Sequence, residues 1–369
     1  MKVPFVDLKR QYETIKREID HAIADCIEHS AFVQGKRVQQ FEKAFANYLQ
    51  VNYVIGCANG TDAIFLSLKA LGIRQGDEVI TSANTFIATS EAISMTGAKV
   101  VFVDVDQNTN NLNVNTVEAK ITEHTKAIVP VHLYGYPADM LELQIIAQKY
   151  HLRIVADAAQ AHGSEINGES IAKFADITTY SFFPGKNLGA FGDAGAVATN
   201  DRHIADYIDK LRNHGRTEKY VHDFEGVNMR MDEMQGAILL AKLSFLNEWT
   251  AQRRSHAAYY NENLKGIGDV IISYDDPNVT AVYHLYVIET SQRDALQRHL
   301  SENGIATGIH YPIPLPLQPA YAYLKMSSTD IPVSSHKAKQ ILSLPMFPEI
   351  TKDEQDFVIE NIKQFFRKG

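Results

Sequence analysis

The chain lacks the features that mark secreted, membrane-spanning and nucleic-acid-binding proteins. Among its 369 residues there are 2 cysteines, Cys26 and Cys57, which are too few for a disulfide framework. No stretch approaches the ~20 apolar residues that span a bilayer, and the charged start MKVPFVDLKRQYETIKREID has no apolar signal-peptide core. Acidic residues (44) outnumber basic ones (36) without any Lys/Arg run, so neither nucleic acid nor a membrane is an expected partner. We therefore expect a cytoplasmic protein.

Two further absences remove classes of enzyme. The 14 histidines are scattered and no H-E-x-x-H motif occurs, so we expect no metal site. The segment Gly56-Cys-Ala-Asn-Gly60 does not supply the G-x-G-x-x-G loop of a nucleotide-dependent dehydrogenase. A metal hydrolase and a dehydrogenase are both disfavoured.

Between about residues 52 and 200, short apolar runs alternate with amphipathic segments. The runs predict strands at 53–56, 78–82, 99–104, 127–133, 152–157, 177–182 and 195–199. The segments between them predict helices at 61–71, 85–96, 114–121 and 140–150. This alternation, with strands rich in Val, Ile and Ala, predicts an α/β fold: a mostly parallel central sheet with helices on both faces.

The character of the chain changes at both ends. An N-terminal arm contains one expected amphipathic helix with Ile15, Ile19 and Cys26 on a face, and a long helix is expected from 235 to about 263. Beyond it, 283–290 reads as a strand and 293–303 as a helix, and Thr351-Lys-Asp-Glu354 has the pattern of a capping box before a last helix. We expect a large α/β domain at 1–245, which includes the arm, and a small C-terminal α+β domain at 246–369.

An aspartate and a lysine stand where ligands gather in open α/β sheets, just beyond strand ends. Asp157 ends a predicted strand, where a helix cap and a functional anion are equally consistent with the sequence. Lys186 follows the strand at 177–182, and a lone lysine is most often a solvated surface group. Four glycines at 185, 189, 192 and 195 surround it, and glycine at that density indicates close approach of the backbone to another group.

Two weaker features face the same edge of the sheet. Gly60 and Thr61 open a helix directly after a strand, so their backbone N–H groups are available to a phosphate, although an ordinary turn would look the same. Phe86 follows the next strand, where its ring can pack on a planar ligand or in the core. Together with Lys186 and a buried Asp157, these groups match the needs of pyridoxal 5′-phosphate (PLP): an amine for its aldehyde, a carboxylate for its pyridine nitrogen and a phosphate cradle. A buried, charge-assisted hydrogen bond of this kind contributes roughly 1.5–3 kcal/mol.

At this point the sequence resembles a known family along nearly its whole length. The matching segments are NGTDAI (59–64), TSANTFIAT (81–89), DAAQAHG (157–163), SFFPGKNLGAFGD (181–193), RNHG (212–215), GVNMRMDEMQGAIL (226–239) and SLPMFP (343–348). The chain is similar to the DegT/DnrJ/EryC1/StrS sugar-nucleotide aminotransferases, which are PLP enzymes of fold type I. The resemblance implies L-glutamate as the amino donor, 2-oxoglutarate as its product, and a homodimer with shared active sites.

The resemblance also implies a role for each matching residue. Lys186 is the lysine that binds the cofactor aldehyde and shuttles the proton, and Asp157 pairs with the pyridine nitrogen. The other expected cofactor contacts are Gln160 to the ring hydroxyl, Phe86 stacked on the ring, and Gly60, Thr61, Ser181 and the neighbouring subunit's Asn228 at the phosphate. For Asn228, a loop residue that satisfies a turn is the alternative. Lys186 also favours transamination over the C-3 deoxygenation of similar PLP enzymes, which have histidine there, and over a non-catalytic regulatory relative.

The sugar substrate is specified less closely. The segments 131–140 and 304–312 resemble enzymes that act at C-3 of a dTDP-3-keto-6-deoxyhexose, in which Phe183, His310 and Tyr311 would line the sugar-nucleotide pocket. Pro316 stands where many relatives have histidine, and Phe183 where several C-3 enzymes have tyrosine. A C-4 or UDP-linked sugar therefore stays an alternative. For the diphosphate, Arg216 and Lys219 are the best basic candidates, although a solvated loop explains them equally well.

Overall fold

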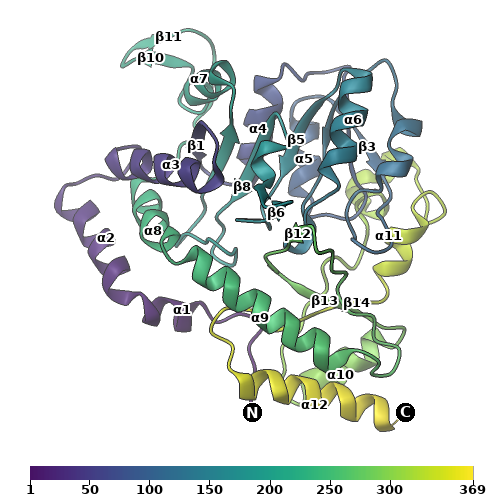
Figure 1. Ribbon diagram of the computed structural model, residues 1–369. Helices are drawn as coiled ribbons and strands as arrows, with labels where there is room; N and C mark the ends of the chain where they lie inside the picture. The colour runs from purple at the N-terminus through teal and green to yellow at the C-terminus, as the bar shows by residue number, and fades with distance from the viewer. Residues whose placement is uncertain (369) are drawn as a thin grey trace.

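The computed structural model describes residues 1–368, and its centre is a seven-stranded sheet with the order β1-β9-β8-β5-β4-β2-β3 (Figure 1). The strands are β1 (Tyr53–Cys57), β2 (Glu78–Ser82), β3 (Lys99–Val103), β4 (Thr125–Val129), β5 (Arg153–Asp157), β8 (Ile177–Ser181) and β9 (Gly195–Thr199). β9 runs antiparallel to both of its neighbours, and the other adjacent pairs are parallel. The expectation of a mostly parallel sheet is confirmed.

Helices cover both faces of this sheet. The covering helices are α3 (Lys36–Leu49), α6 (Met140–Tyr150) and α8 (Glu233–Leu243) on one face, and α4 (Gly60–Ala70), α5 (Ala88–Met95) and α7 (Arg202–Leu211) on the other. Because side chains alternate along a strand, neighbouring residues of β5 enter different cores. Ile154 and Ala156 pack against the first layer, and Val155 packs against the second. Burial on both faces explains why these strands read as continuous apolar runs.

The helical predictions at both ends of the large unit need correction. The expected single helix of the arm is two helices, α1 (Leu8–Thr14) and α2 (Lys16–Glu28), which break at Ile15. The expected helix at 235–263 is likewise α8 followed by α9 (Leu246–Leu264). The expected helix at 114–121 is wrong: two short 3₁₀ turns occur there, on either side of Val117. Val117 is the one buried residue of this segment, so a longer helix would gain little from packing.

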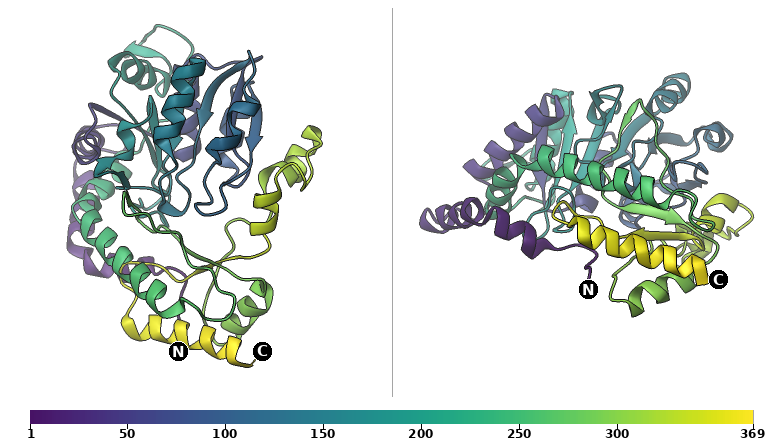
Figure 2. Two further views of the ribbon diagram at one scale, coloured as in Figure 1. Left: turned by 45° about the vertical axis from the view of Figure 1, so that its right-hand side comes forward. Right: turned by 60° about the horizontal axis from the view of Figure 1, so that its bottom comes forward.

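A smaller unit lies below the sheet in Figure 1, around its own apolar core. It consists of α9, α10 (Arg293–Glu302), α12 (Lys352–Lys368) and the antiparallel pair β13 (Tyr286–Glu289) and β14 (Ile341–Leu344). The capping box is confirmed: the Glu354 N–H donates to Thr351 Oγ1 at 3.2 Å, and the Thr351 N–H donates to Glu354 Oε2 at 2.8 Å. α11 (Pro332–Lys337) instead reaches back to the large unit, where the N–H of Val333 donates to Asp104 Oδ2 at 2.8 Å (Figure 2).

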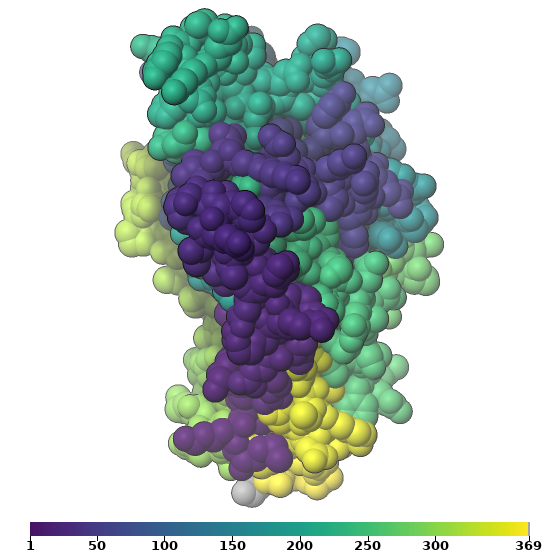
Figure 3. Space-filling model, turned by 90° about the vertical axis from the view of Figure 1, so that its left-hand side faces the viewer, coloured from purple at the N-terminus to yellow at the C-terminus, as the bar shows by residue number. Residues whose placement is uncertain are grey.

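The remaining strands are short, and the N-terminal arm joins the two units. The short strands are β6 (Glu165–Ile166), β7 (Glu169–Ser170), β10 (Arg216–Glu218), β11 (Val221–His222) and β12 (Val279–Thr280). Figure 3 shows the purple arm along one face, beside the yellow C-terminal segment, and Arg10 pairs there with Glu354 at 2.9 Å. Within residues 1–368, no helix is both long enough and apolar enough to cross a membrane. The boundary at residue 245 stays a prediction.

Candidate active site

A cavity of about 560 Å³ lies at the carboxyl ends of the parallel strands, between the sheet and the smaller unit. Ten residues that the sequence singled out line it: Gly60, Thr61, Phe86, Asp157, Gln160, Ser181, Phe183, Lys186, His310 and Tyr311. They come from segments up to 251 residues apart, from Gly60 to Tyr311. The cavity is therefore the candidate active site.

Asp157 ends β5 and is 5% exposed. Thr89 Oγ1 donates to its Oδ2 at 2.8 Å, and the Ala159 N–H donates to its Oδ1 at 3.1 Å. Burial raises the pKa of this carboxyl, while both hydrogen bonds and the positive charge of Lys186 oppose the rise. Residues 158–164, directly after Asp157, are turn and irregular structure and not a helix, so the helix-cap alternative is wrong.

Lys186 lies in the loop between β8 and β9, partly exposed to the cavity. The surrounding protein desolvates its ammonium group and lowers the pKa to about 8, although attraction to Asp157 acts in the opposite direction. A neutral amine is thus accessible near neutral pH. The loop is closely folded: a Cβ at Gly189 would lie 2.3 Å from the Pro184 carbonyl oxygen, and one at Gly195 would lie 2.2 Å from that of Asn59. Gly189 and Gly195, two of the four glycines around Lys186, therefore approach the chain's own backbone and not a ligand.

The start of α4 forms an anion cradle beside Ser181. Asn59 caps the helix, because its side chain accepts a hydrogen bond from the Asp62 N–H at 2.8 Å. The N–H groups of Gly60 and Thr61 lie in the first turn, where no carbonyl of the helix can accept from them, so they are free to bind an anion. A Cβ at Gly60 would lie 2.6 Å from Ser181 Cβ, which shows how tightly the helix start and the end of β8 fit together.

Aromatic and amide side chains form the opposite walls. Phe86 and Phe183 are 56% and 57% exposed, so neither is a core residue. The Phe86 ring centroid lies 6.0 Å from that of Tyr311, at a tilt of 40°. Gln160 accepts from the Tyr134 N–H at 2.6 Å and donates from Nε2 to the Tyr311 hydroxyl at 3.2 Å, so its amide is fixed in orientation.

Three predicted site residues do not line this cavity within one chain: Arg216, Lys219 and Asn228. Arg216 and Lys219 belong to the β10–β11 hairpin, which projects from the body of the molecule beside α7 (Figure 1). Asn228 lies near the base of this segment, where its backbone bridges to that of Asn213. Their expected contacts are not made within one chain and stay predictions.

Several cavity residues were not found from the sequence. Arg253 of α9 is 3% exposed, its Nη1 donates to the carbonyl oxygens of Tyr283 and Met346, each at 3.1 Å, and its Nε has no partner. His284 also lines the cavity, and desolvation holds its pKa well below the usual range, so the ring is neutral. Thr89 and Phe5 are two more. Of these four residues, only Thr89, inside the TSANTFIAT segment, carried a signal in the sequence.

The residues present fit PLP. No group of three or more His, Cys, Asp or Glu side chains arranged to hold a metal occurs within residues 1–368. Lys186, Asp157 and the free N–H groups of Gly60 and Thr61 share one cavity, as an aldehyde, a pyridine nitrogen and a phosphate on one molecule require. The buried carboxylate suits a protonated ring nitrogen, because a desolvated anion gains from a cationic partner.

Comparisons with known proteins agree with this geometry. Residues 13–363 match the DegT/DnrJ/EryC1/StrS aminotransferase family. A "Pleiotropic regulatory protein" of Geobacillus stearothermophilus is 46% identical over 100% of this chain and 99% of its own. The dTDP-3-amino-3,4,6-trideoxy-alpha-D-glucose transaminase of Streptomyces venezuelae is 41% identical over 99% of this chain and 96% of its own.

Solved structures match equally well. DesV of S. venezuelae, in complex with a ketimine intermediate, superposes with a TM-score of 0.97 at 40% identity, over 99% of this chain and 98% of its own. NtdA of Bacillus subtilis, with bound cofactor PMP, superposes with a TM-score of 0.92 at 33% identity, over 99% of this chain and 85% of its own. The chain belongs to the DegT/DnrJ/EryC1/StrS aminotransferase family and is a PLP-dependent sugar aminotransferase.

Proposed function

We propose that the enzyme moves the amino group of L-glutamate to the C-3 carbonyl of a dTDP-3-keto-6-deoxyhexose, releasing 2-oxoglutarate and the 3-amino-3,6-dideoxy sugar nucleotide. The observation that carries amino transfer is the meeting of Lys186, Asp157 and the start of α4 in one cavity. The C-3 position rests on the His310-Tyr311 pair at the cavity wall and on the resemblance of segments 131–140 and 304–312 to C-3 enzymes.

Lys186 and Asp157 carry the proton chemistry of this proposal. When bound, PLP supplies an aldehyde and an electron sink for the carbon that loses its proton. Because the pKa of Lys186 lies at about 8, its Nζ is a nucleophile in the neutral form and then takes and returns a proton at the substrate carbon. Asp157, fixed by Thr89 and Ala159, stays ionised and holds the proton on the pyridine nitrogen.

Arg253 is the best candidate for the carboxylate of glutamate. Its guanidinium is buried at the cavity wall with Nε unpartnered, and desolvation lowers its pKa to about 10. A buried cation without an acidic partner is costly, and a bound carboxylate offsets that cost. We also propose that Arg216, Lys219 and Asn228 act on the cavity of the partner in a homodimer. None of the three lines the cavity of its own chain, and the hairpin of Arg216 and Lys219 projects away from the body of the molecule.

The test is direct amination by the purified holoenzyme. Incubation with L-glutamate and a dTDP-3-keto-6-deoxyhexose should give a product in which an amino group and a hydrogen replace the carbonyl oxygen, as measured by mass spectrometry, with the nitrogen placed at C-3 by NMR. Matched incubations use a 4-keto isomer and a UDP-linked 3-keto sugar. Faster turnover of either sugar would contradict the proposed substrate but not the proposed amino transfer.

A further inference from the structure

His284 is a cavity residue to which the proposed amino transfer assigns no role. It lines the candidate active site, in the segment that leads into β13. Before it, the Val282 N–H donates to the Gly135 carbonyl at 3.0 Å. After it, the Leu285 N–H donates to the Tyr134 carbonyl at 3.4 Å. These two hydrogen bonds hold the backbone of His284 beside the cavity.

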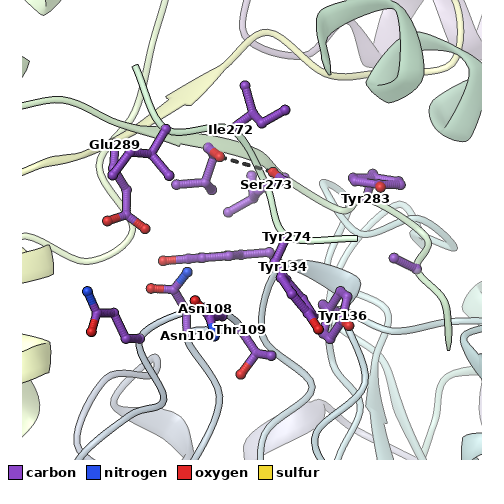
Figure 4. Close-up of a pocket in the computed structure, with 15 residues that line it drawn as sticks. Asn108, Thr109, Asn110, Tyr134, Tyr136, Ile272, Ser273, Tyr274, Tyr283 and Glu289 are labelled. Atoms are coloured by element: carbon purple, nitrogen blue, oxygen red, sulfur yellow. Dashed lines mark hydrogen bonds between the residues drawn. The ribbon is translucent and has the colours of Figure 1, made fainter. Parts of the chain in front are cut away.

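The residue before His284 faces another cavity. Tyr283 lines a neighbouring space of about 210 Å³, which Tyr134 and Glu289 also line (Figure 4). His284 does not line that space, and Tyr283 does not line the candidate active site. The two side chains thus point into different cavities, and the imidazole is the one that a substrate of the amino transfer can reach.

A fixed amide determines which ring nitrogen of His284 carries the hydrogen. Asn187, the residue after Lys186, donates from Nδ2 to the Val282 carbonyl at 3.0 Å. Its Oδ1 is therefore the atom that lies 3.3 Å from His284 Nδ1. An amide oxygen only accepts hydrogen bonds, so Nδ1 is the protonated nitrogen. In a neutral imidazole the other nitrogen, Nε2, is then an acceptor.

The ring is neutral, so Nε2 keeps its lone pair. Desolvation lowers the pKa of His284 well below its usual value, and the positive charges of Lys186 and Arg253 lower it further. Nε2 itself is accessible and has no hydrogen-bond partner among residues 1–368. An unpaired acceptor thus opens into the cavity beside the loop that carries the lysine.

An acceptor at this place distinguishes the two substrates of an amino transfer. The carboxylates of glutamate only accept hydrogen bonds, so they gain nothing from Nε2, and the amino group of glutamate is the group that is transferred. A sugar hydroxyl, in contrast, can donate. Because the sugar carbon that receives nitrogen must lie within reach of Lys186, the hydroxyls on its two neighbouring carbons come near His284.

We infer that His284 Nε2 accepts a hydrogen bond from a sugar hydroxyl on a carbon adjacent to the reacting carbonyl, so that His284 selects the sugar and not the amino donor. This role rests on the proposed transfer to a keto sugar. Asn187 is the positioning residue that holds the imidazole in the required tautomer. Arg253 Nη1 donates to the His284 carbonyl at 3.4 Å, so the groups assigned to the two substrates are neighbours on one wall.

Steady-state kinetics of the PLP-loaded enzyme test this role. Because the donor leaves before the sugar binds, kcat/KM for each substrate reports its own half of the reaction. The test variant is His284→Phe, which keeps a flat ring and removes the acceptor. The matched control is His256→Phe in α9. The His256 ring also pairs with a side-chain amide oxygen, Gln355 Oε1 at 2.9 Å, but does not line the cavity.

We expect His284→Phe to lower kcat/KM for a dTDP-3-keto-6-deoxyhexose about tenfold and to leave kcat/KM for L-glutamate within about twofold of wild type. Analogues of this sugar that lack the C-2 or the C-4 hydroxyl identify the donor. With one of the two, wild type should react about tenfold more slowly than with the parent sugar, whereas His284→Phe should react with both at the same rate. His256→Phe should retain the wild-type preference.

Three results would overturn the role of His284. Equal losses of kcat/KM for glutamate and for the sugar would indicate damage to Lys186 or to the fold. A His284→Phe enzyme that prefers the parent sugar as strongly as wild type does would not use the acceptor. Wild type that reacts with both analogues as fast as with the parent sugar would exclude the hydrogen bond without any variant.

Failure of the proposed substrate gives a different result. If wild type aminates the 4-keto isomer or the UDP-linked sugar and not the dTDP-3-keto sugar, the proposed C-3 substrate is wrong. The role of His284 is then measured in the same way, with the sugar that reacts and its analogues that lack a hydroxyl beside the carbonyl.

Discussion

Replacing Thr89 by valine tests how the protein keeps Asp157 ionised. The Thr89 hydroxyl donates to Asp157 Oδ2 at 2.8 Å, and it is one of the two hydrogen bonds that counteract the effect of burial on that carboxyl. A hydrogen bond to a charged group contributes about 1.5–3 kcal/mol, and one pKa unit corresponds to about 1.4 kcal/mol. Loss of the hydroxyl should therefore raise the pKa of Asp157 by about 1–2 units.

The consequence appears on the acid side of the pH profile. Asp157 acts as an anion, so activity falls as pH drops through its pKa, and a higher pKa moves this fall to higher pH. We expect the acid limb of kcat/KM for L-glutamate to move upward by about 1–2 pH units in Thr89→Val, with activity recovering toward high pH.

The control is Thr81→Val. Thr81 is a fully buried threonine of β2, and its hydroxyl donates to the Val129 carbonyl at 2.8 Å and not to Asp157. This variant should lose about 1 kcal/mol of stability and keep the wild-type pH profile. An unshifted acid limb in Thr89→Val, or an equal shift in Thr81→Val, would refute the reasoning.

Four other variants test separate parts of the site. Lys186→Met should stabilise the cofactor-free protein by at most about 3 kcal/mol at pH 7, because the folded-state pKa of Lys186, about 8, lies below the usual 10.5. In urea unfolding, the difference in stability between variant and wild type should vanish as pH rises from 8 to 10.5. A difference that does not change with pH would contradict this. Gly60→Ala should weaken PLP binding about tenfold in a fluorescence titration, since its Cβ would lie 2.6 Å from Ser181 Cβ, and unchanged affinity would exclude the cradle. Arg253→Lys should raise KM for glutamate about tenfold more than KM for the sugar nucleotide; equal changes would indicate a structural role only. Arg216→Glu should show the reverse preference, and equal effects on both substrates would remove it from the diphosphate site.

Local patterns predicted the parts of the fold that depend on local physics. Thr351 and Glu354 form their reciprocal hydrogen bonds within four residues, so the capping box could be predicted from the sequence. The strands could be predicted because burial on both faces requires uninterrupted apolar runs. The break between α8 and α9 could not be predicted, because the apolar periodicity continues across Ser244 and tertiary packing decides where the chain turns.

The residues of the candidate site also fall into those that the sequence could reveal and those that it could not. Asp157, Lys186 and Gly60 were found because each stands at a strand end or in a glycine-rich loop, which are features of neighbouring residues. Arg253 was missed, because its significance lies in burial without a full set of partners, and that arises only when distant segments meet.

The absorption spectrum of the PLP-loaded enzyme, recorded before and after addition of L-glutamate alone, tests the central claim most directly. If Lys186 binds the cofactor and glutamate is the donor, a near-visible band should be present and should bleach when glutamate is added, with 2-oxoglutarate released in equal amount. Lys186→Ala should lack the starting band. A wild-type band that persists in excess glutamate would contradict the proposed donor, and a Lys186→Ala spectrum identical to wild type would contradict the assignment of the catalytic lysine.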